Sequence, residues 1–315
     1  HVLLVMLSAT IPRPEALTEW IAHIKARPVG LVTTDFRPVP LNHYVYWDGK
    51  LQPLVVDGET HPSVYTRVRL DRLAAADATD ARRRTRAPPT ASRRGGNAGT
   101  EASTTLAPPV SSAAAPSATA TPPVAPFNGT AFLNGVVDTL NREDKLPGFF
   151  FCFSRRLCSV YANSIQRSLV TAEDAARTAK RFRTLLHQNV DVDNHTLPQV
   201  EQLGHMLEHG VAIHHSGLLP ALKEIVETLF AEGRVRALFV TETFAVGINL
   251  ATKCVVLTDV SKHDGHRLRL LRADEYQQIA GRAGRRGLDT RGTCVVLPGL
   301  QRATDDSLPP VDTLL

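Results

Sequence analysis

The sequence has few cysteines, and their placement argues against a disulfide framework and against a metal site. The four cysteines lie in or beside apolar stretches without Cys-x-x-Cys spacing: Cys152, Cys158, Cys254 and Cys294. We therefore expect buried free thiols in a reducing, intracellular compartment. A zinc site that combines them with His214 and His215 is disfavoured, because adjacent side chains on a strand point to opposite faces and rarely share a metal.

The chain also lacks any apolar run of about 18 residues, the length that a membrane-spanning helix needs. Residues 1–7 are largely apolar, but they lack the basic region of a signal peptide. The sequence therefore predicts no membrane partner. It does not distinguish a nuclear from a cytoplasmic location.

Large apolar residues are nearly missing between about residues 74 and 126, where Ala, Thr, Ser, Pro and Arg dominate. Because such a composition cannot bury enough apolar surface to fold, we predict a low-complexity, mostly disordered linker with limits at 73–144. Its arginines at 82–84, 86 and 93–94 offer RNA binding through phosphate charge as an alternative. We favour a solvated linker, because Arg outnumbers Lys throughout the chain and not only here.

The chain has a net charge of +5 and a pI near 9.2, values that fit a nucleic-acid partner. The low-complexity stretch supplies much of this excess. Charge alone therefore does not identify RNA as the partner.

Apolar runs of strand length alternate with helical spacing in the second half of the chain. We predict strands at 148–153, 211–214, 235–240, 254–258 and 292–297. We predict helices at 155–167, 172–187, 198–208, 220–231 and 272–279. This alternation predicts an α/β fold, with a parallel sheet covered by helices on both faces and functional loops at the carboxyl ends of the strands.

The most informative segment is residues 278–287, with the sequence QIAGRAGRRG. Its glycines allow backbones to approach closely, and the guanidinium groups of Arg282 and Arg285 suit phosphate oxygens. This combination is what an arginine finger needs. Taken alone, the segment is equally compatible with a basic, glycine-rich surface loop.

Further segments accompany it in a consistent order. Four segments resemble helicase motifs III, IV, V and VI: 8–10 (SAT), 151–155 (FCFSR), 241–250 (TETFAVGINL) and 278–285 (QIAGRAGR). Four more resemble markers of one helicase group: 37–41 (RPVPL), 214–220 (HHSGLLP), 262–265 (KHDG) and 285–289 (RRGLD). Over residues 1 to about 72 and about 145 to 299, the chain resembles the superkiller-type DExH-box RNA helicases, the superfamily-two group that feeds RNA to the exosome.

The resemblance implies a second RecA-like domain at 145–299, with helices on both faces of a parallel sheet. Residues 1–72 would hold the end of a first RecA-like domain and a connecting segment, and 300–315 would be a tail. The Gly-Lys-Ser/Thr phosphate loop and the DExH motif of this group do not occur in the sequence. We therefore expect a fragment that is inactive alone, with its apolar strand at residues 2–7 partly exposed and poor solubility.

The resemblance also assigns residues to ATP and implies Mg²⁺, whose ligands would lie outside this chain. Arg282 and Arg285 would neutralise charge that develops on the γ-phosphate, and Gln278 would orient the attacking water or the phosphate. The implied nucleotide-binding positions are Gly247, Asn249, Gly281 and Gly284. Asn249 is alternatively a turn-forming residue.

The implied RNA contacts are to backbone phosphates, because a translocating motor must not read sequence. They are Thr241 in motif V and Ser154 with Arg155 in motif IV, and His214, His215 and Ser216 are weaker candidates. Motif III, composed of Ser8, Ala9 and Thr10, would couple the two lobes.

We therefore favour part of an ATP-dependent RNA helicase that couples hydrolysis to 3′–5′ translocation and unwinding. Its partners would be RNA and, in exosome-linked decay or processing, the exosome or its adaptor proteins. One alternative is a DNA-repair helicase of the same branch, which the RPVPL and Arg285-Arg286-Gly287 elements disfavour. The other is a non-catalytic remnant that binds RNA or protein.

Overall fold

One eight-stranded sheet organises the computed structural model, which describes residues 5–7, 13–34, 36–68, 70–71, 129–190, 196–248 and 250–298. The strand order is β3-β2-β1-β10-β7-β4-β6-β5. The strands are β1 (Leu41–Trp47), β2 (Lys50–Val56), β3 (Glu59–Thr60), β4 (Gly148–Phe151), β5 (Val211–His214), β6 (Ala237–Val240), β7 (Cys254–Leu257) and β10 (Gly292–Val296). A separate hairpin pairs β8 (Ser261–His263) with β9 (Leu268–Leu270).

The centre of the sheet is parallel and completely buried. From β1 through β10, β7, β4 and β6 to β5, every neighbouring pair is parallel. Every residue of β4, β5, β6, β7 and β10 is buried, as expected for strands covered on both faces. All five strands predicted from apolar runs are confirmed, with ends shifted by a residue or two.

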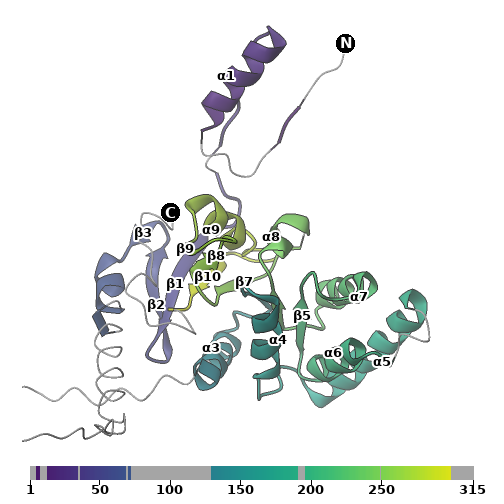
Figure 1. Cartoon of the computed structure of the whole chain (residues 1–315). Helices are drawn as coiled ribbons and strands as arrows, with labels where there is room; N and C mark the ends of the chain where they lie inside the picture. The colour runs from purple at the N-terminus through teal and green to yellow at the C-terminus, as the bar shows by residue number, and fades with distance from the viewer. Residues whose placement is uncertain are drawn as a thin grey trace, which may run out of the picture.

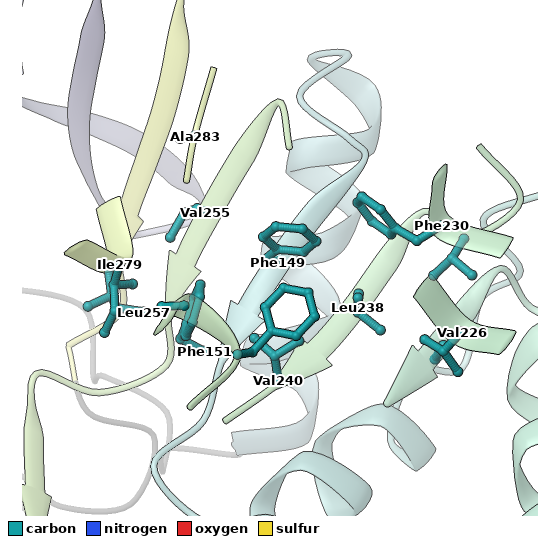
Figure 2. Close-up of a cluster of buried hydrophobic side chains, with 14 of the residues drawn as sticks. Phe149, Phe151, Val226, Phe230, Leu238, Val240, Val255, Leu257, Ile279 and Ala283 are labelled. Carbon is teal, nitrogen blue, oxygen red and sulfur yellow. The ribbon is translucent and has the colours of Figure 1, made fainter. Parts of the chain in front are cut away.

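Helices cover both faces of the sheet (Figure 1). The helices are α1 (Pro14–Lys25), α3 (Gly129–Arg142), α4 (Arg155–Asn163), α5 (Ala172–Asn189), α6 (Pro198–Glu208), α7 (Pro220–Ala231), α8 (Thr243–Gly247) and α9 (Ala273–Ala280). Alternation along β4 sends Phe149 and Phe151 to one core and Phe150 to the other. In the first core, Phe149 packs against Phe230 of α7, with ring centroids 4.8 Å apart (Figure 2). The predicted α/β class and its five helices are confirmed.

The first three strands correct the predicted domain boundary. Residues 1–72 were predicted to hold the end of a first RecA-like domain and a connecting segment, yet β1 pairs in parallel with β10 and extends the sheet of the second domain. Two turns, Asp48-Gly49 and Asp57-Gly58, join β1 to β2 and β2 to β3, and all four residues have positive φ. Asp-Gly is a strong hairpin signal in a sequence, and it was overlooked here.

Helix α3 corrects the end of the predicted linker. The linker was placed at 73–144, but residues 129–142 form a helix that buries Leu133, Val136, Val137 and Leu140 against the second core. Its apolar residues follow helical spacing, which the composition of the preceding stretch obscured. The low-complexity stretch at 74–126 lies outside the described residues.

Helix α1 stands apart from the sheet (Figure 1). It buries only Ile21, whereas Trp20 is 60% exposed and Ile24 is 55% exposed. Among the residues of the predicted first strand, 5–7 are described; they are exposed and are not in a strand. The predicted exposure is thus confirmed for these three residues. The predicted strand is not present at residues 5–7.

Candidate functional site

A cavity of about 390 Å³ opens where the parallel strands end. Ser154 and Arg155 follow β4, Ser216 follows β5, and Thr241 follows β6, so all four reach the cavity from the same edge of the sheet. The structure therefore brings together the three predicted RNA contacts, Ser154, Arg155 and Thr241. The weaker candidate Ser216 joins them.

The hydroxyl groups in this cavity are available to a ligand. Ser154 is the N-cap residue of α4, but its hydroxyl caps none of the backbone amides in the described helix. Thr241 shares a 3.0 Å hydrogen bond with the hydroxyl of Thr243. Together with the guanidinium of Arg155, these groups offer hydrogen-bond donors that suit phosphate oxygens.

The two adjacent histidines have different surroundings. His214 Nε2 lies 2.8 Å from Glu227 Oε1, and burial lowers the pKa of His214 although this carboxylate opposes the shift. His215 Nδ1 accepts a hydrogen bond from the amide of Gly217, so a neutral ring carries its proton on Nε2. That buried Nε2 has no hydrogen-bond partner among the described residues. His214 is thus a satisfied structural residue, and His215 keeps an unused donor.

The second group of candidates lies in the arginine loop, defined here as residues 281–289 after α9. Arg285 donates from Nε and Nη2 to the two carboxylate oxygens of Asp289, each at 2.8 Å, and from its backbone amide at 2.9 Å. This bond lowers the pKa of Asp289, whose side chain is only 4% exposed. Because the Arg285 side chain remains 31% exposed, part of its fork is open to solvent.

Arg282 links the arginine loop to the cavity. Its guanidinium donates to the backbone carbonyl of Ala245 in α8, and burial lowers its pKa. Helix α8 begins at Thr243, which lines the cavity beside Thr241. Motif V therefore connects the predicted RNA contacts to one predicted catalytic arginine through a single short helix.

Two glycines of the arginine loop, Gly281 and Gly284, are required by packing. Gly284 has φ +92°, and a Cβ there would lie 2.7 Å from Val39 Cγ1. At Gly281, a Cβ would lie 2.8 Å from the carbonyl oxygen of Gln277. Gly247, at the end of α8, is exposed with open space around it, and Gln278 is exposed on α9. The nucleotide contacts of Gly247, Gly281 and Gly284 and the catalytic role of Gln278 remain predictions.

Residues 37–41 resembled a group marker in the sequence, but no role was predicted for them. In the structure they hold the arginine loop in place through hydrogen bonds. Arg37 donates from Nη2 to the carbonyl of Ala283 at 2.6 Å and from Nε to that of Val39 at 2.8 Å. The amide of Gly292 donates to the carbonyl of Pro40 at 2.8 Å. The bond from Arg37 to Ala283 satisfies a backbone carbonyl of the arginine loop, and the bond from Gly292 to Pro40 ties residues 37–41 to β10. Sequence reasoning missed this function of Arg37.

A buried pair anchors α9 to the sheet. The Tyr276 hydroxyl and His43 Nδ1 on β1 share a 2.6 Å hydrogen bond. Burial and then the nearby Arg37 lower the pKa of His43 to about 4. His43 is therefore neutral near pH 7 and can accept this hydrogen bond.

Sequence reasoning also missed a group of ion pairs between the cavity and α9. Lys262 on β8 contacts both Glu242 and Glu275, and Arg269 on β9 contacts Glu275. The sequence marked residues 262–265 as a group feature, but it gave no indication of these pairs. Lys262 and Glu242 also line the cavity.

Four predicted positions lie outside the described residues: Ser8, Ala9, Thr10 and Asn249. Within the described ranges, no group of three or more His, Cys, Asp or Glu residues could hold a metal ion. All four cysteines are buried and unpaired, as predicted. No helix in the described ranges is both long and apolar enough to cross a membrane.

Residues 162–287 match the family described as the helicase conserved C-terminal domain. The chain contains a helicase C-terminal domain. This domain includes Thr241 and both arginines, and β4 with Ser154 and Arg155 directly precedes the match.

The chain that carries the helicase C-terminal domain is also similar to several curated proteins. It is 36% identical over 296 residues to the DExH-box ATP-dependent RNA helicase DExH10 of Arabidopsis thaliana, covering 93% of this chain and 27% of the relative. It is 33% identical over 297 residues to the exosome RNA helicase MTR4 of Mus musculus (93% and 25%). It is 32% identical over 304 residues to superkiller complex protein 2 of Homo sapiens (94% and 22%).

The chain thus spans about a quarter of the length of the curated relatives it matches. The similarity runs through nearly all of the chain rather than the helicase C-terminal domain alone. The resemblance to superkiller-type DExH-box RNA helicases is confirmed.

Proposed function

We propose that the chain forms the second lobe of an ATP-dependent RNA helicase that translocates 3′–5′ and unwinds RNA for exosome-linked decay or processing. The observation that carries this proposal is the single cavity that collects Ser154, Arg155 and Thr241 and continues through α8 to Arg282. The names of the relatives, an exosome RNA helicase and a superkiller complex protein, support RNA and the exosome as partners.

RNA would be held through its backbone. The cavity offers hydroxyl and guanidinium donors, which suit phosphate oxygens and do not distinguish bases. Ser154 and Thr241 would donate hydroxyl hydrogens, and Arg155 would supply positive charge. Such contacts give the sequence-independent grip that a motor needs.

The arginine loop would face the triphosphate of ATP, whose hydrolysis supplies the free energy for lobe movement. The exposed part of the Arg285 fork fits phosphate oxygens, and Asp289 holds this guanidinium in one orientation. Arg282 and Arg285 would neutralise charge in the transition state, while Gln278 would position water or phosphate. Within the described ranges no group of three or more His, Cys, Asp or Glu residues could hold Mg²⁺, so its ligands would lie outside those ranges.

The test is RNA-stimulated ATPase activity in the longest protein that the gene encodes. We compare the wild type with Arg285→Ala and with Arg286→Ala, a matched control at an exposed neighbouring arginine. Loss of an arginine finger costs about 10³ to 10⁵ in turnover, so Arg285→Ala should abolish stimulation while RNA binding persists. Arg286→Ala should retain RNA-stimulated ATPase activity.

Two results would overturn the proposal. If the wild-type protein binds RNA without hydrolysing ATP, the non-catalytic alternative is favoured. If DNA stimulates hydrolysis and RNA does not, a DNA helicase of the same branch is favoured.

A further inference from the structure

Lys262 lies between two carboxylates that belong to different parts of the site. Its Nζ is 2.5 Å from Glu242 Oε1 and 2.8 Å from Glu275 Oε1. Glu242 directly follows Thr241 at the cavity, whereas Glu275 stands in the first turn of α9. One ammonium group therefore joins the predicted RNA contacts to the helix that leads into the arginine loop.

The α9 end of this connection is firmly held. Arg269 on β9 donates to both oxygens of Glu275, at 2.7 and 2.8 Å, and the amide of Arg272 donates to Glu275 at 2.9 Å. The Glu275 side chain is 8% exposed, and the bond from Arg269 holds its pKa far below the usual range. Because a fixed, charged Glu275 caps α9, a change at Lys262 would act on the helix rather than on a loose side chain.

The Glu242 end is open to a ligand. Glu242 is 34% exposed, and both Lys262 and Glu242 line the cavity with Ser154, Arg155 and Thr241. A phosphate bound there would compete with Glu242 for the three N–H donors of Lys262. It would also repel the Glu242 carboxylate.

We propose that Lys262 is a positioning residue that couples RNA occupancy of the cavity to α9 and the arginine loop. In the free protein, Lys262 bridges Glu242 and Glu275. When an RNA phosphate enters, the ammonium exchanges Glu242 for phosphate and keeps Glu275, so that α9 and Arg282 respond to RNA. This inference rests on the proposed function.

The test separates coupling from binding by measuring ATPase rate against RNA concentration in the longest protein that the gene encodes. The variant is Lys262→Met. The matched control is Lys253→Met, because Lys253 pairs with Asp144 at 2.6 Å and does not line the cavity. For Lys262→Met we expect kcat at saturating RNA to fall by between about 5-fold and 150-fold, the usual range for coupling between sites. RNA-free turnover and thermal stability should stay close to those of Lys253→Met.

A double-mutant cycle with Glu242→Gln tests the connection itself. If the two residues act as one link, the double variant loses no more stimulation than the more impaired single variant. Losses that multiply would overturn the proposal.

Other outcomes would also overturn it. If Lys262 only binds RNA, the half-saturating RNA concentration rises and kcat at saturation is unchanged. If Lys262 is only structural, RNA-free turnover and the melting temperature fall together. If the wild type shows no RNA stimulation, the proposed function fails as well, whereas normal stimulation in Lys262→Met rejects this inference alone.

Discussion

The arginine loop and helix α1 differ in how each is held to the rest of the protein. The loop has few apolar side chains, yet hydrogen bonds from Arg37 and Thr252 fix its backbone. Helix α1 has a good apolar stripe, yet it buries only Ile21. The comparison shows that helical periodicity predicts a helix but not the surface against which the helix packs. It also shows that hydrogen bonds can hold a glycine-rich loop firmly in place.

The largest difference in stability should appear when the same substitution, isoleucine to alanine, is made on α9 and on α1. Ile279 on α9 is 1% exposed and Ile24 on α1 is 55% exposed. Ile279→Ala should lower the free energy of unfolding by about 2–5 kcal/mol, because it leaves a cavity in the core. Ile24→Ala should change it by less than about 0.5 kcal/mol. Urea unfolding of both variants checks this, and equal losses would mean that α1 is packed as tightly as α9.

The anchor of α9 should make stability depend on pH. The pKa of His43 is about 4 in the folded protein, against 6.5 when unfolded, so the unfolded state binds a proton more readily. Stability should therefore fall as pH drops from about 6.5 to about 4, by about 3 kcal/mol in total. Urea unfolding at pH 7 and pH 4.5 measures the loss.

His214 and His215 also have lowered pKa values, so they contribute in the same direction. His43→Gln isolates the effect, because Gln does not titrate and keeps an acceptor for Tyr276. The difference between wild type and this variant should shrink as pH falls. A constant difference would show that His43 is not the titrating group.

The smallest difference in stability should separate alanine substitutions at two glycines of the arginine loop. Gly284 and Gly287 both have positive φ, but a Cβ would meet Val39 only at Gly284. Backbone strain is common to both alanine variants, so Gly284→Ala should be less stable than Gly287→Ala by about 1–3 kcal/mol, the cost of overpacking. Thermal unfolding of the pair measures this difference. Equal melting temperatures would show that Val39 moves aside freely.

The sequence allowed prediction of the central strands and their helices for a clear physical reason. Strands β4 to β7 and β10 are buried on both faces, so their apolar runs are unbroken. Three residues of the cavity, Ser154, Arg155 and Thr241, were predicted from the resemblance to helicase motifs IV and V, and they meet because each follows one of these strands. Ser154, Arg155 and Thr241 needed no side-chain geometry to be grouped.

The remaining features depend on contacts that no local pattern carries. Strand β1 is only partly buried and pairs with β10 at the far end of the chain. Arg37 and Ala283 are likewise brought together only by the fold. The pairing of Lys262 with Glu275 requires the β8–β9 hairpin, whose short strands have little apolar character. The Asp-Gly turns and the helical spacing of the apolar residues in α3 were local indications that were overlooked.

The parallel pairing of β1 with β10 sets an order for folding. Leu41 pairs with Gly292, so β1 is synthesised long before β10 and cannot pair with it until the chain between them has emerged. Contacts so distant in sequence slow folding, because the chain must close a long loop before the contact stabilises it. The entropic cost of closing a loop grows only with the logarithm of its length. The long stretch between β3 and α3 therefore adds little to the cost of pairing β1 with β10. Until β10 arrives, the β1–β2 hairpin presents an unpaired edge, the kind of surface that chaperones protect.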